Sequence, residues 1–533
     1  MSFTSRNWLA SILLVFVAAS QNGCDRPDKP TSDANLPRLR ELDFSPFEKG
    51  LEALPEKRVT TILSLVTDAT IPEVQTAFEN GLLTSEELTL FFLRRIKRHD
   101  DDLRSYTELN PLALEEARNA DRLRAAGEVR GPLHGIPINL KDNIGTTAPM
   151  HTTAGAEILL EHSPVKEAVL VTQLREAGAV ILGKAALSEL AGSLTTEPPG
   201  YNAVSGIGVN PYGKDFPVSG SSSGSGISAS AYLTMVSVGT ETSGSLISPA
   251  SMNGVIGMKP GLGLVSGEGI IPLIRFQDSA GPVARHVMDA AILLAVIDAT
   301  EVDYAAGLDA KALEGVAVGV LRVGIIGKGG SDETSEWLAL IDQGLSKAKA
   351  VSRDVAETFD GKPELLPLIF LGLSEDTIGY ISSAGAPVKT LADLKAYNAA
   401  EPVTRIPRGQ NMIEVGTQIL AAIVTETGVG EEHLGPLYKE AAQEARERAS
   451  ALLARTFAEN RVELLVSLSN THSDVYATAG YPAITIPLGL NRAGEPNGVT
   501  FIGKQGDDAK LLSYAHAFEA ATRYRRNPEA VLK

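Results

Sequence analysis

The stretch Val218–Ser245 reads VSGSSSGSGISASAYLTMVSVGTETSGS and places two clusters of glycine and serine on either side of an apolar segment. The first cluster runs directly into a pattern that predicts a helix at Ile227–Thr234, and a short strand follows at Met235–Gly239. A flexible Gly/Ser linker would not continue at once into apolar helix and strand. We therefore interpret the first cluster as a loop in a packed region, where the main chain closely approaches another group.

Helical and strand-like segments alternate through the rest of the chain. The predicted helices cover 84–127, with an interruption at Pro111, and Glu167–Ala177, and the predicted strands cover Ala179–Gly183, Val462–Ser467 and Ala483–Pro487. Thr84 and Glu87 are spaced as a capping box for the first helix. The alternation favours an α/β fold around a largely parallel sheet, and strand patterns near both ends favour one interwoven domain. Residues 310–460 are more helical and are expected to cover one side.

The composition of the 533-residue chain is that of a globular protein, with 44% hydrophobic and 21% charged residues. The 48 basic and 65 acidic residues give a formal charge of −17, which argues against a nucleic-acid partner because such proteins need a basic face. Cys24 is the one cysteine, so the chain can form no intrachain disulfide and no cysteine-based zinc site.

The first 24 residues have the pattern of an export signal. Arg6 precedes the apolar run Leu9–Ala19, which is too short for a membrane span of about 20 residues, and small residues follow it. The end of this segment resembles a bacterial lipoprotein signal, which implies a lipidated Cys24 that tethers the protein to a membrane. Gln21 departs from that pattern, so cleavage after Ser20 and a buried N-terminal helix remain alternatives.

These features predict an exported protein, either periplasmic or anchored to a membrane. The expected organisation is an export signal at 1–24, a polar tether and N-terminal segment at 25–58, and the main domain at 59–528.

The second Gly/Ser cluster, Gly239–Ser245, follows the predicted strand directly. A turn of small residues at a strand end can present several N–H groups to one point, as a developing oxyanion requires. Ser245 lies where a nucleophile could stand, and a serine nucleophile needs a base. Among the eight histidines only His472, near Asp474, is kept as a reserve base. The lack of a convincing histidine favours a lysine.

The candidate lysine is Lys141, which ends the apolar, strand-like run Gly135–Leu140. A solvated lysine has a pKa of about 10.4, so a base that works near pH 8 needs a pKa lower by roughly 2–3 units. Desolvation at a buried position can supply that change. The alternative for any single lysine is a charged group at the surface.

Three segments together resemble the amidase signature family, and their Gly-Thr-Glu-Thr loop is most similar to its bacterial peptide amidase branch. They are Gly131–Asp142, Ser219–Ser225 and Gly239–Pro249 with its continuation Asn253–Pro260. Further matches lie at Gly183–Lys184, Glu189, Gln277–Pro282, Ala479–Thr485 and Phe501–Gly503. The resemblance covers about residues 60–527. It implies one large α/β domain with a central mixed β-sheet flanked by helices on both faces.

The resemblance also implies a mechanism and its residues. Lys141 matches the general base, Ser221 the bridging serine, and Ser245 the acylated nucleophile of an amide-bond hydrolase. The backbone N–H groups of Thr242, Ser243, Gly244 and Ser245 match the oxyanion hole. The implied substrate is a small-molecule or peptide amide, with no metal and no organic cofactor.

Several positions depart from the family pattern, and two other functions stay open. Ser219 and Ser223 replace glycines, Ser243 replaces glycine or aspartate, and Ile247 replaces an arginine that usually pairs with an acidic residue at the position of Glu241. The alternatives are a non-catalytic exported protein that binds an amide or peptide, and an amidotransferase A-type subunit. The substrate pocket is expected within 310–480, with candidate lining residues Tyr380, Tyr397, Ile406, Met412 and His472.

Overall fold

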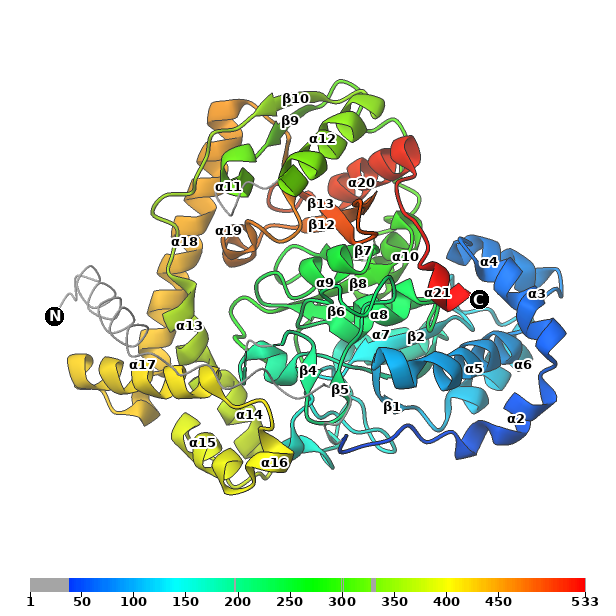
Figure 1. Cartoon of the computed structure of the whole chain (residues 1–533), viewed down its shortest axis with the longest axis horizontal. Helices are drawn as coiled ribbons and strands as arrows, with labels where there is room; N and C mark the ends of the chain where they lie inside the picture. The colour runs from blue at the N-terminus through cyan, green and yellow to red at the C-terminus, as the bar shows by residue number, and fades with distance from the viewer. Residues whose placement is uncertain (1–37, 196–197, 299, 301, 327–331, 533) are drawn as a thin grey trace.

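The computed structural model describes residues 38–195, 198–298, 300, 302–326 and 332–532 (Figure 1). The predicted export signal, Cys24 and the first part of the tether lie outside these residues and stay predictions. Within the predicted segment 25–58, Phe47, Leu51 and Leu54 are buried in the main core. The proposed domain boundaries likewise stay predictions.

One eleven-stranded sheet passes through the molecule. Its strands, in spatial order, are β1 (Tyr106–Leu109), β3 (Val180–Ala185), β2 (Pro137–Lys141), β6 (Val236–Glu241), β8 (Ser279–Ala284), β7 (Ile256–Lys259), β12 (Ala483–Leu490), β13 (Pro496–Ile502), β11 (Leu464–Leu468), β9 (Ala317–Val320) and β10 (Val351–Asp354). Strand β9 lies between β10 and the C-terminal strand β11, so the chain is interwoven as expected.

The sheet is mixed, which confirms the implication of the family resemblance and corrects the prediction of a largely parallel sheet. Strand β2 is parallel to β3 and β6, and β9 is parallel to β10 and β11. The run from β6 through β8, β7, β12 and β13 to β11 is antiparallel. Local helix–strand alternation indicated the parallel part only, because antiparallel neighbours such as β12 and β13 follow each other without a helix between them.

The predicted helices are present with a strand between two of them. They are α5 (Ser85–Leu103), α6 (Ala113–Ala125) and α7 (Val169–Glu176). The capping box of α5 is confirmed, since Glu87 N donates to Thr84 Oγ1 at 3.1 Å and Thr84 N donates to Glu87 Oε2 at 3.2 Å. Sequence analysis missed β1, a four-residue strand that depends on distant pairing with β3.

Helices cover both faces of the sheet, as successive side chains of one strand show. On β8, Val283 packs with residues of α8 (Ser223–Ser230) and α9 (Ile247–Met252), whereas Ala284 belongs to the main core together with α10 (Val287–Ile297). Neighbouring residues of a strand point to opposite faces, so these helices lie on opposite sides. The remaining helices near the sheet are α2 (Glu48–Ala53), α3 (Glu56–Val66), α4 (Ile71–Glu79), α11 (Arg322–Ile326), α12 (Asp332–Lys347), α19 (Ser473–Ala479), α20 (Asp508–Thr522) and α21 (Glu529–Leu532). A separate two-stranded sheet pairs β4 (Tyr201–Asn202) with β5 (Gly206–Ile207).

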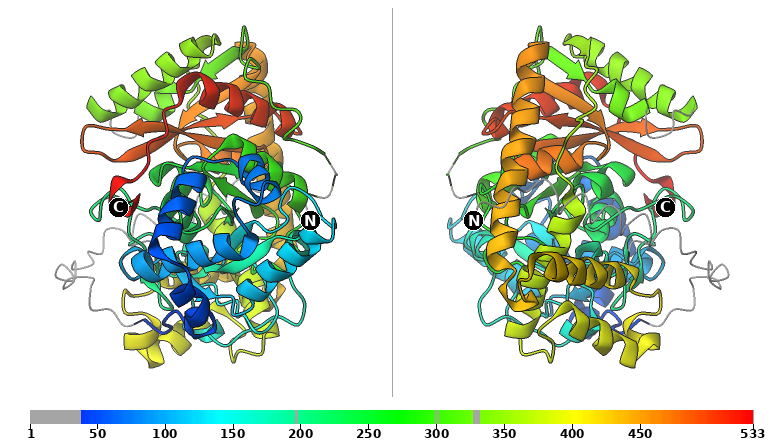
Figure 2. Two further views of the ribbon diagram at one scale, coloured as in Figure 1. Left: turned by 90° about the vertical axis from the view of Figure 1, so that its right-hand side faces the viewer. Right: turned by 90° about the vertical axis from the view of Figure 1, so that its left-hand side faces the viewer.

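The helical region 310–460 forms a second hydrophobic core instead of only covering the sheet. This second core is built from α13 (Leu365–Gly372), α14 (Ile378–Ser383), α15 (Leu391–Ala400), α17 (Asn411–Thr427) and the start of α18 (Gly435–Asn460), beside the short α16 (Pro402–Arg405). Figure 2 shows α18 running from this group of helices along one side to the far end of the molecule. The segment Leu365–Ser383 is apolar enough to cross a membrane, but half of it is buried here.

Candidate active site

Lys141 is the last residue of β2, the strand that lies between β3 and β6, and it is fully buried. Its Nζ lies 2.7 Å from Ser221 Oγ, 2.8 Å from Thr240 Oγ1 and 3.1 Å from the Thr240 carbonyl oxygen. The apolar residues before it on β2 hold the strand in the core, and strand alternation determines where the lysine points. The structure thus places Lys141 against the first Gly/Ser cluster.

Burial lowers the pKa of Lys141 to about 7, because a charged ammonium loses its hydration there. The charges of Asp278 and Glu241 oppose this effect and raise the pKa, yet burial dominates. An amine with a pKa near 7 is uncharged in a large fraction of molecules at neutral pH, and it then has a lone pair that can accept a proton.

Hydrogen bonds join the two Gly/Ser clusters to each other. The Gly220–Ser221 peptide bond is cis, and Ser222 N donates to the Ser245 carbonyl oxygen at 2.9 Å. Ser222 Oγ donates to the Thr240 carbonyl oxygen at 2.9 Å. Ser245 is therefore held beside Ser221 through the main chain. In the described part of the chain, the Ser245 hydroxyl makes no hydrogen bond of its own.

Close packing of α8 explains the small residues of the first cluster. A Cβ on Gly224 would lie 2.4 Å from the Ser105 carbonyl oxygen and 2.4 Å from Ala186 N. Every residue of α8 is buried. The interpretation of this cluster as a close approach of main chain is confirmed.

The residues Thr242, Ser243, Gly244 and Ser245 form the turn that follows β6. Gly244 has a φ of 80°, in the region that favours glycine. Among the described residues, none of these four N–H groups donates to a protein acceptor. Ser243 and Ser245 are partly exposed. The turn therefore offers unpaired donors beside a serine, which suits a developing negative charge.

Glu241, the acidic residue that lacks the usual arginine, has one oxygen bonded to the main chain, whereas its buried Oε1 has no hydrogen-bond partner among the described residues. Its Oε2 accepts hydrogen bonds from Leu246 N and Ile247 N, each at 2.9 Å, at the start of α9. A carboxylate is stabilised by the free N–H groups of a helix N-terminus. The substitution at Ile247, which is buried, is compensated in this way at one of the two carboxylate oxygens.

Two of the serines that replace glycine have different environments. Ser219 has a φ of 59°, where a residue other than glycine is strained, and its Oγ lies 2.6 Å from Ser248 Oγ. Ser223 begins α8, and its buried hydroxyl has no hydrogen-bond partner among the described residues. The third, Ser243, donates from its hydroxyl to Ser473 Oγ at 3.2 Å.

A cavity of about 240 Å³ opens beside Thr240 and Thr242. It is lined by Asn143, Ala191, Thr240, Thr242, Gly267, Ile270, Pro272, Leu273, Arg275, Asp278, Ser279 and Ala280. Asn143 Nδ2 donates to Thr240 Oγ1 at 3.1 Å, which connects the cavity to the group that holds Lys141. Apolar walls with a few polar groups are typical of a small-ligand site. A larger groove of about 530 Å³ at Phe457 and Arg461 contains none of the predicted site residues.

Comparison with known proteins agrees with this geometry. The family model described as Amidase matches residues 87–384. A probable amidase of Arabidopsis thaliana is 35% identical, covering 87% of this chain and 92% of its own. The chain belongs to the amidase family. The peptide amidase structure from Stenotrophomonas maltophilia is 35% identical with a TM-score of 0.77, covering 87% of this chain and 98% of its own. A glutamyl-tRNA(Gln) amidotransferase subunit of Moorella thermoacetica is 30% identical, covering 84% of this chain and 95% of its own.

Membership of the amidase family makes the chain an amide hydrolase. Sequence analysis named Lys141, Ser221 and Ser245 but did not single out the residues around them. Thr240, Asn143 and Asp278 were missed because each reaches the amidase site from a different strand or loop. The available signals were that Thr240 lies in the second Gly/Ser cluster and Asp278 in the family-matching segment Gln277–Pro282.

The reserve base His472 lies in another environment of the amidase. Its Nδ1 is 2.7 Å from Ser467 Oγ, and its ring packs edge-on against Phe359. Asp474, which suggested the pairing, contacts Lys362 instead. These contacts of His472 are with Ser467 and Phe359, and neither supports a role as base for Ser245.

The other candidate lining residues are not among the residues that line the cavity. Tyr380 OH is 3.0 Å from His162 Nε2, and Tyr397 OH donates to Glu157 at 2.8 Å. Tyr380, Tyr397, Ile406 and Met412 pack against the second core. The expectation that these residues line the substrate pocket is wrong for this cavity, whose walls come mainly from residues 267–280.

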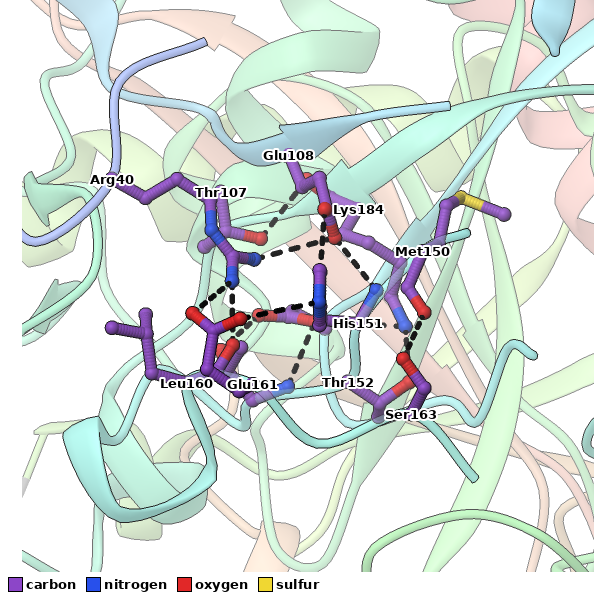
Figure 3. Close-up of polar contacts among 12 residues, drawn as sticks. Arg40, Thr107, Glu108, Met150, His151, Thr152, Leu160, Glu161, Ser163 and Lys184 are labelled. Carbon is purple, nitrogen blue, oxygen red and sulfur yellow. Dashed lines mark hydrogen bonds and ion pairs between the residues drawn. The ribbon is translucent and has the colours of Figure 1, made fainter. Parts of the chain in front are cut away.

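A polar network supports the chain that follows Lys141 (Figure 3). The fully buried Lys184 lies 3.5 Å from Asp142 Oδ1 and donates to the Ile144 carbonyl oxygen at 2.6 Å and to Thr152 Oγ1 at 2.9 Å. These contacts fix both ends of the loop 142–152. The loop that follows strand β2 is thereby tied to β3, which carries Lys184.

The network continues outward to the N-terminal segment. His151 Nδ1 lies 2.8 Å from Glu108 Oε1, and Arg40 NH1 lies 3.3 Å from Glu108 Oε2 (Figure 3). Arg40 also contacts Glu161 at 3.7 Å. Residue 40 is thereby connected to strand β1 and to the loop after Lys141.

Proposed function

We propose that this amidase cleaves its substrate with Ser245 as nucleophile, Ser221 as bridging group and Lys141 as base. The observation that carries the proposal is the buried Lys141 Nζ, 2.7 Å from Ser221 Oγ, with its pKa lowered to about 7. The main-chain bond between Ser222 and Ser245 supports the third member, because it holds Ser245 next to Ser221.

In the proposed mechanism, neutral Lys141 accepts the Ser221 hydroxyl proton while Ser221 accepts the proton of Ser245. The Ser245 oxygen bonds to the amide carbon, and the carbonyl oxygen becomes an oxyanion that the N–H groups of 242–245 stabilise. The C–N bond then breaks, and the relay returns its proton to the leaving nitrogen. Water attacks the acyl-enzyme by the same relay, releasing the acid and restoring Ser245.

The first test substitutes each of the three residues. Ser245→Ala, Ser221→Ala and Lys141→Met should each lower kcat/KM by about 10³-fold or more, since members of such a unit act together. A fluorophosphonate probe should label wild type at Ser245, as peptide mass mapping would show. Full turnover in both Ser245→Ala and Lys141→Met would overturn the proposal.

Lys259→Met is the matched control for this test. Lys259 is also fully buried with its pKa lowered to about 8, but it donates to the carbonyl oxygens of Pro260 and Tyr481 and not to a serine. Loss of a buried amine alone should leave kcat near the wild-type value.

The substrate class we propose is a small-molecule or peptide amide, and a panel of aryl, alkyl and peptide amides with mass detection of products tests it. A protein that binds these amides without turnover, and is not labelled by the probe, would support the non-catalytic alternative. Purification in a complex with partner subunits would support the amidotransferase alternative.

We propose that the protein is exported and that Cys24 anchors it to a membrane. The support is the sequence pattern of residues 1–24 alone. Expression of the full chain in a Gram-negative host tests it. A mature N-terminus at lipidated Cys24 and release from membranes in Cys24→Ala are expected, and an intact Met1 would contradict export.

A further inference from the structure

Thr242, the first residue of the turn that precedes Ser245, is held by two adjacent residues. Thr242 Oγ1 donates to Asp278 Oδ1 at 2.5 Å, and Gln277 Nε2 donates to the Thr242 carbonyl oxygen at 2.6 Å. Gln277 is fully buried. Side chain and main chain of one residue are therefore both fixed from the segment before β8.

The other oxygen of Asp278 holds a wall of the cavity. Asp278 Oδ2 accepts hydrogen bonds from Leu273 N at 2.8 Å and Ile274 N at 3.0 Å. Leu273 and Asp278 both line the cavity beside Thr242. One carboxylate thus joins the turn and the cavity wall.

The bond to the Thr242 carbonyl group has a geometric consequence for Ser243. The Thr242 C=O and the Ser243 N–H belong to one planar peptide group, and in a trans peptide they point in opposite directions. The Thr242–Ser243 peptide is trans, since the cis bonds of the described chain are at 148–149 and 220–221. Because Gln277 anchors the C=O, it also determines the direction of the Ser243 N–H.

We infer that Gln277 and Asp278 are positioning residues that together fix the Thr242–Ser243 peptide group relative to Ser245 and the cavity. The inference rests on the proposed function, in which the Ser243 N–H is one of the oxyanion donors. A donor aimed in advance stabilises the transition state without reorganisation. Loss of the clamp should therefore lower kcat and leave KM unchanged, because the oxyanion exists only during reaction.

The experiment uses Gln277→Leu, which removes the donor to Thr242, and Thr242→Val, which removes the hydroxyl bond to Asp278 with little change of shape. Both variants should lose kcat by on the order of 10- to 100-fold at constant KM. Affinity for phenylboronic acid should fall in parallel, since addition of the Ser245 oxygen to boron forms a tetrahedral anion. Affinity for an uncleaved product acid should stay at the wild-type value.

Asp289→Ala is the control for Asp278→Ala, because it shows how much stability is lost when a buried aspartate is removed elsewhere. Both aspartates are buried with pKa values raised to about 6, and each accepts a main-chain N–H, but Asp289 accepts from Ile71 far from the turn. Asp278→Ala should lose kcat, whereas Asp289→Ala should lose only thermal stability. Wild-type kcat and boronate affinity in both Gln277→Leu and Thr242→Val would overturn the clamp.

Hydrogen exchange separates this inference from the proposed function. If wild type cleaves no amide and binds no boronate, the function fails, but the clamp still predicts faster amide exchange of residues 242–246 in Gln277→Leu and Thr242→Val. Unchanged exchange in that peptide contradicts the clamp whatever the activity.

Discussion

At the scale of single residues, the proposed mechanism depends on the protonation state of Lys141. Its neighbours are two hydroxyls and a carbonyl oxygen, and no carboxylate lies within ion-pair distance among the described residues. A buried carboxylate partner favours the charged ammonium. Lys184, buried equally deeply, has such a partner in Asp142 at 3.5 Å, whose charge opposes the lowering of the Lys184 pKa by burial. We therefore propose a base in Lys141, which contacts hydroxyl groups, and a structural ion pair in Lys184, which contacts a carboxylate.

The pH dependence of turnover should report the pKa of Lys141. The base must be uncharged, so kcat/KM should rise with pH along an acid limb centred near 7. Asp278→Asn removes a charge that raises this pKa, so the limb should move to lower pH. Its amide can still accept from the main chain and donate to Thr242, so most of kcat should remain. Steady-state kinetics from pH 5 to 9 measure both, and an unmoved or higher limb contradicts the assignment.

Lys141 should also lower the free energy of unfolding relative to a variant with an uncharged apolar side chain at this position. A base whose pKa is lower in the folded chain reduces stability as pH falls from about 10.5 toward 7, and the reduction is constant below 7. Lys141→Met should therefore stabilise the fold by up to roughly 4 kcal/mol at pH 7, with a smaller gain near pH 10. Denaturant unfolding at the two pH values measures this, and an equal gain at both would contradict it.

At the scale of elements, the position of α8 depends on the small size of its side chains. Its sequence SGSGISAS has little helix propensity, yet it forms a helix because small side chains allow it to pack tightly against the sheet and α9. The capping box of α5 shows the opposite case, in which local sequence suffices. Elements with strong local signals were predictable, whereas short ones such as β1 depended on a distant partner.

Gly224→Ala tests the packing of α8. The added Cβ would meet main-chain atoms of Ser105 and Ala186 at 2.4 Å, which cannot move independently, so we expect a loss of about 1–3 kcal/mol or more and lower activity. Gly379→Ala in α14 is the control, because nothing lies within 4 Å of its Cβ position and alanine favours helix by up to about 1 kcal/mol. Thermal unfolding of both variants measures the two changes in stability. Equal changes in Gly224→Ala and Gly379→Ala would contradict the packing argument.

At the scale of the whole molecule, the site is assembled where distant segments meet. Strands β2 and β6 bring Lys141 and the turn together, and β8 brings Asp278. The network through Lys184 and Glu108 then connects this region to Arg40 near the start of the described chain (Figure 3). Residues more than 200 positions apart therefore contribute to one local structure.

Lys184→Met should destabilise the whole fold. It leaves the Asp142 carboxylate buried without its cation, which typically reduces stability by about 3–5 kcal/mol. Lys349→Met is the control, since its ion pair with Glu314 is exposed and such pairs contribute about 0–1 kcal/mol. Urea unfolding measures the two differences, and a small change for Lys184→Met would show that the network is not structurally important.

The sequence by itself determined the candidate catalytic residues of the proposal and most of the long elements. Lys141, Ser221 and Ser245 stand in recognisable local contexts, and the helical and strand periodicities are properties of short segments. Only the tertiary structure decided the mixed strand order, the main-chain partners of Glu241, the cavity walls at 267–280 and the clamp on Thr242. The physical reason is that burial and hydrogen-bond partners depend on segments far apart in the chain, and it is this burial that lowers the pKa of Lys141.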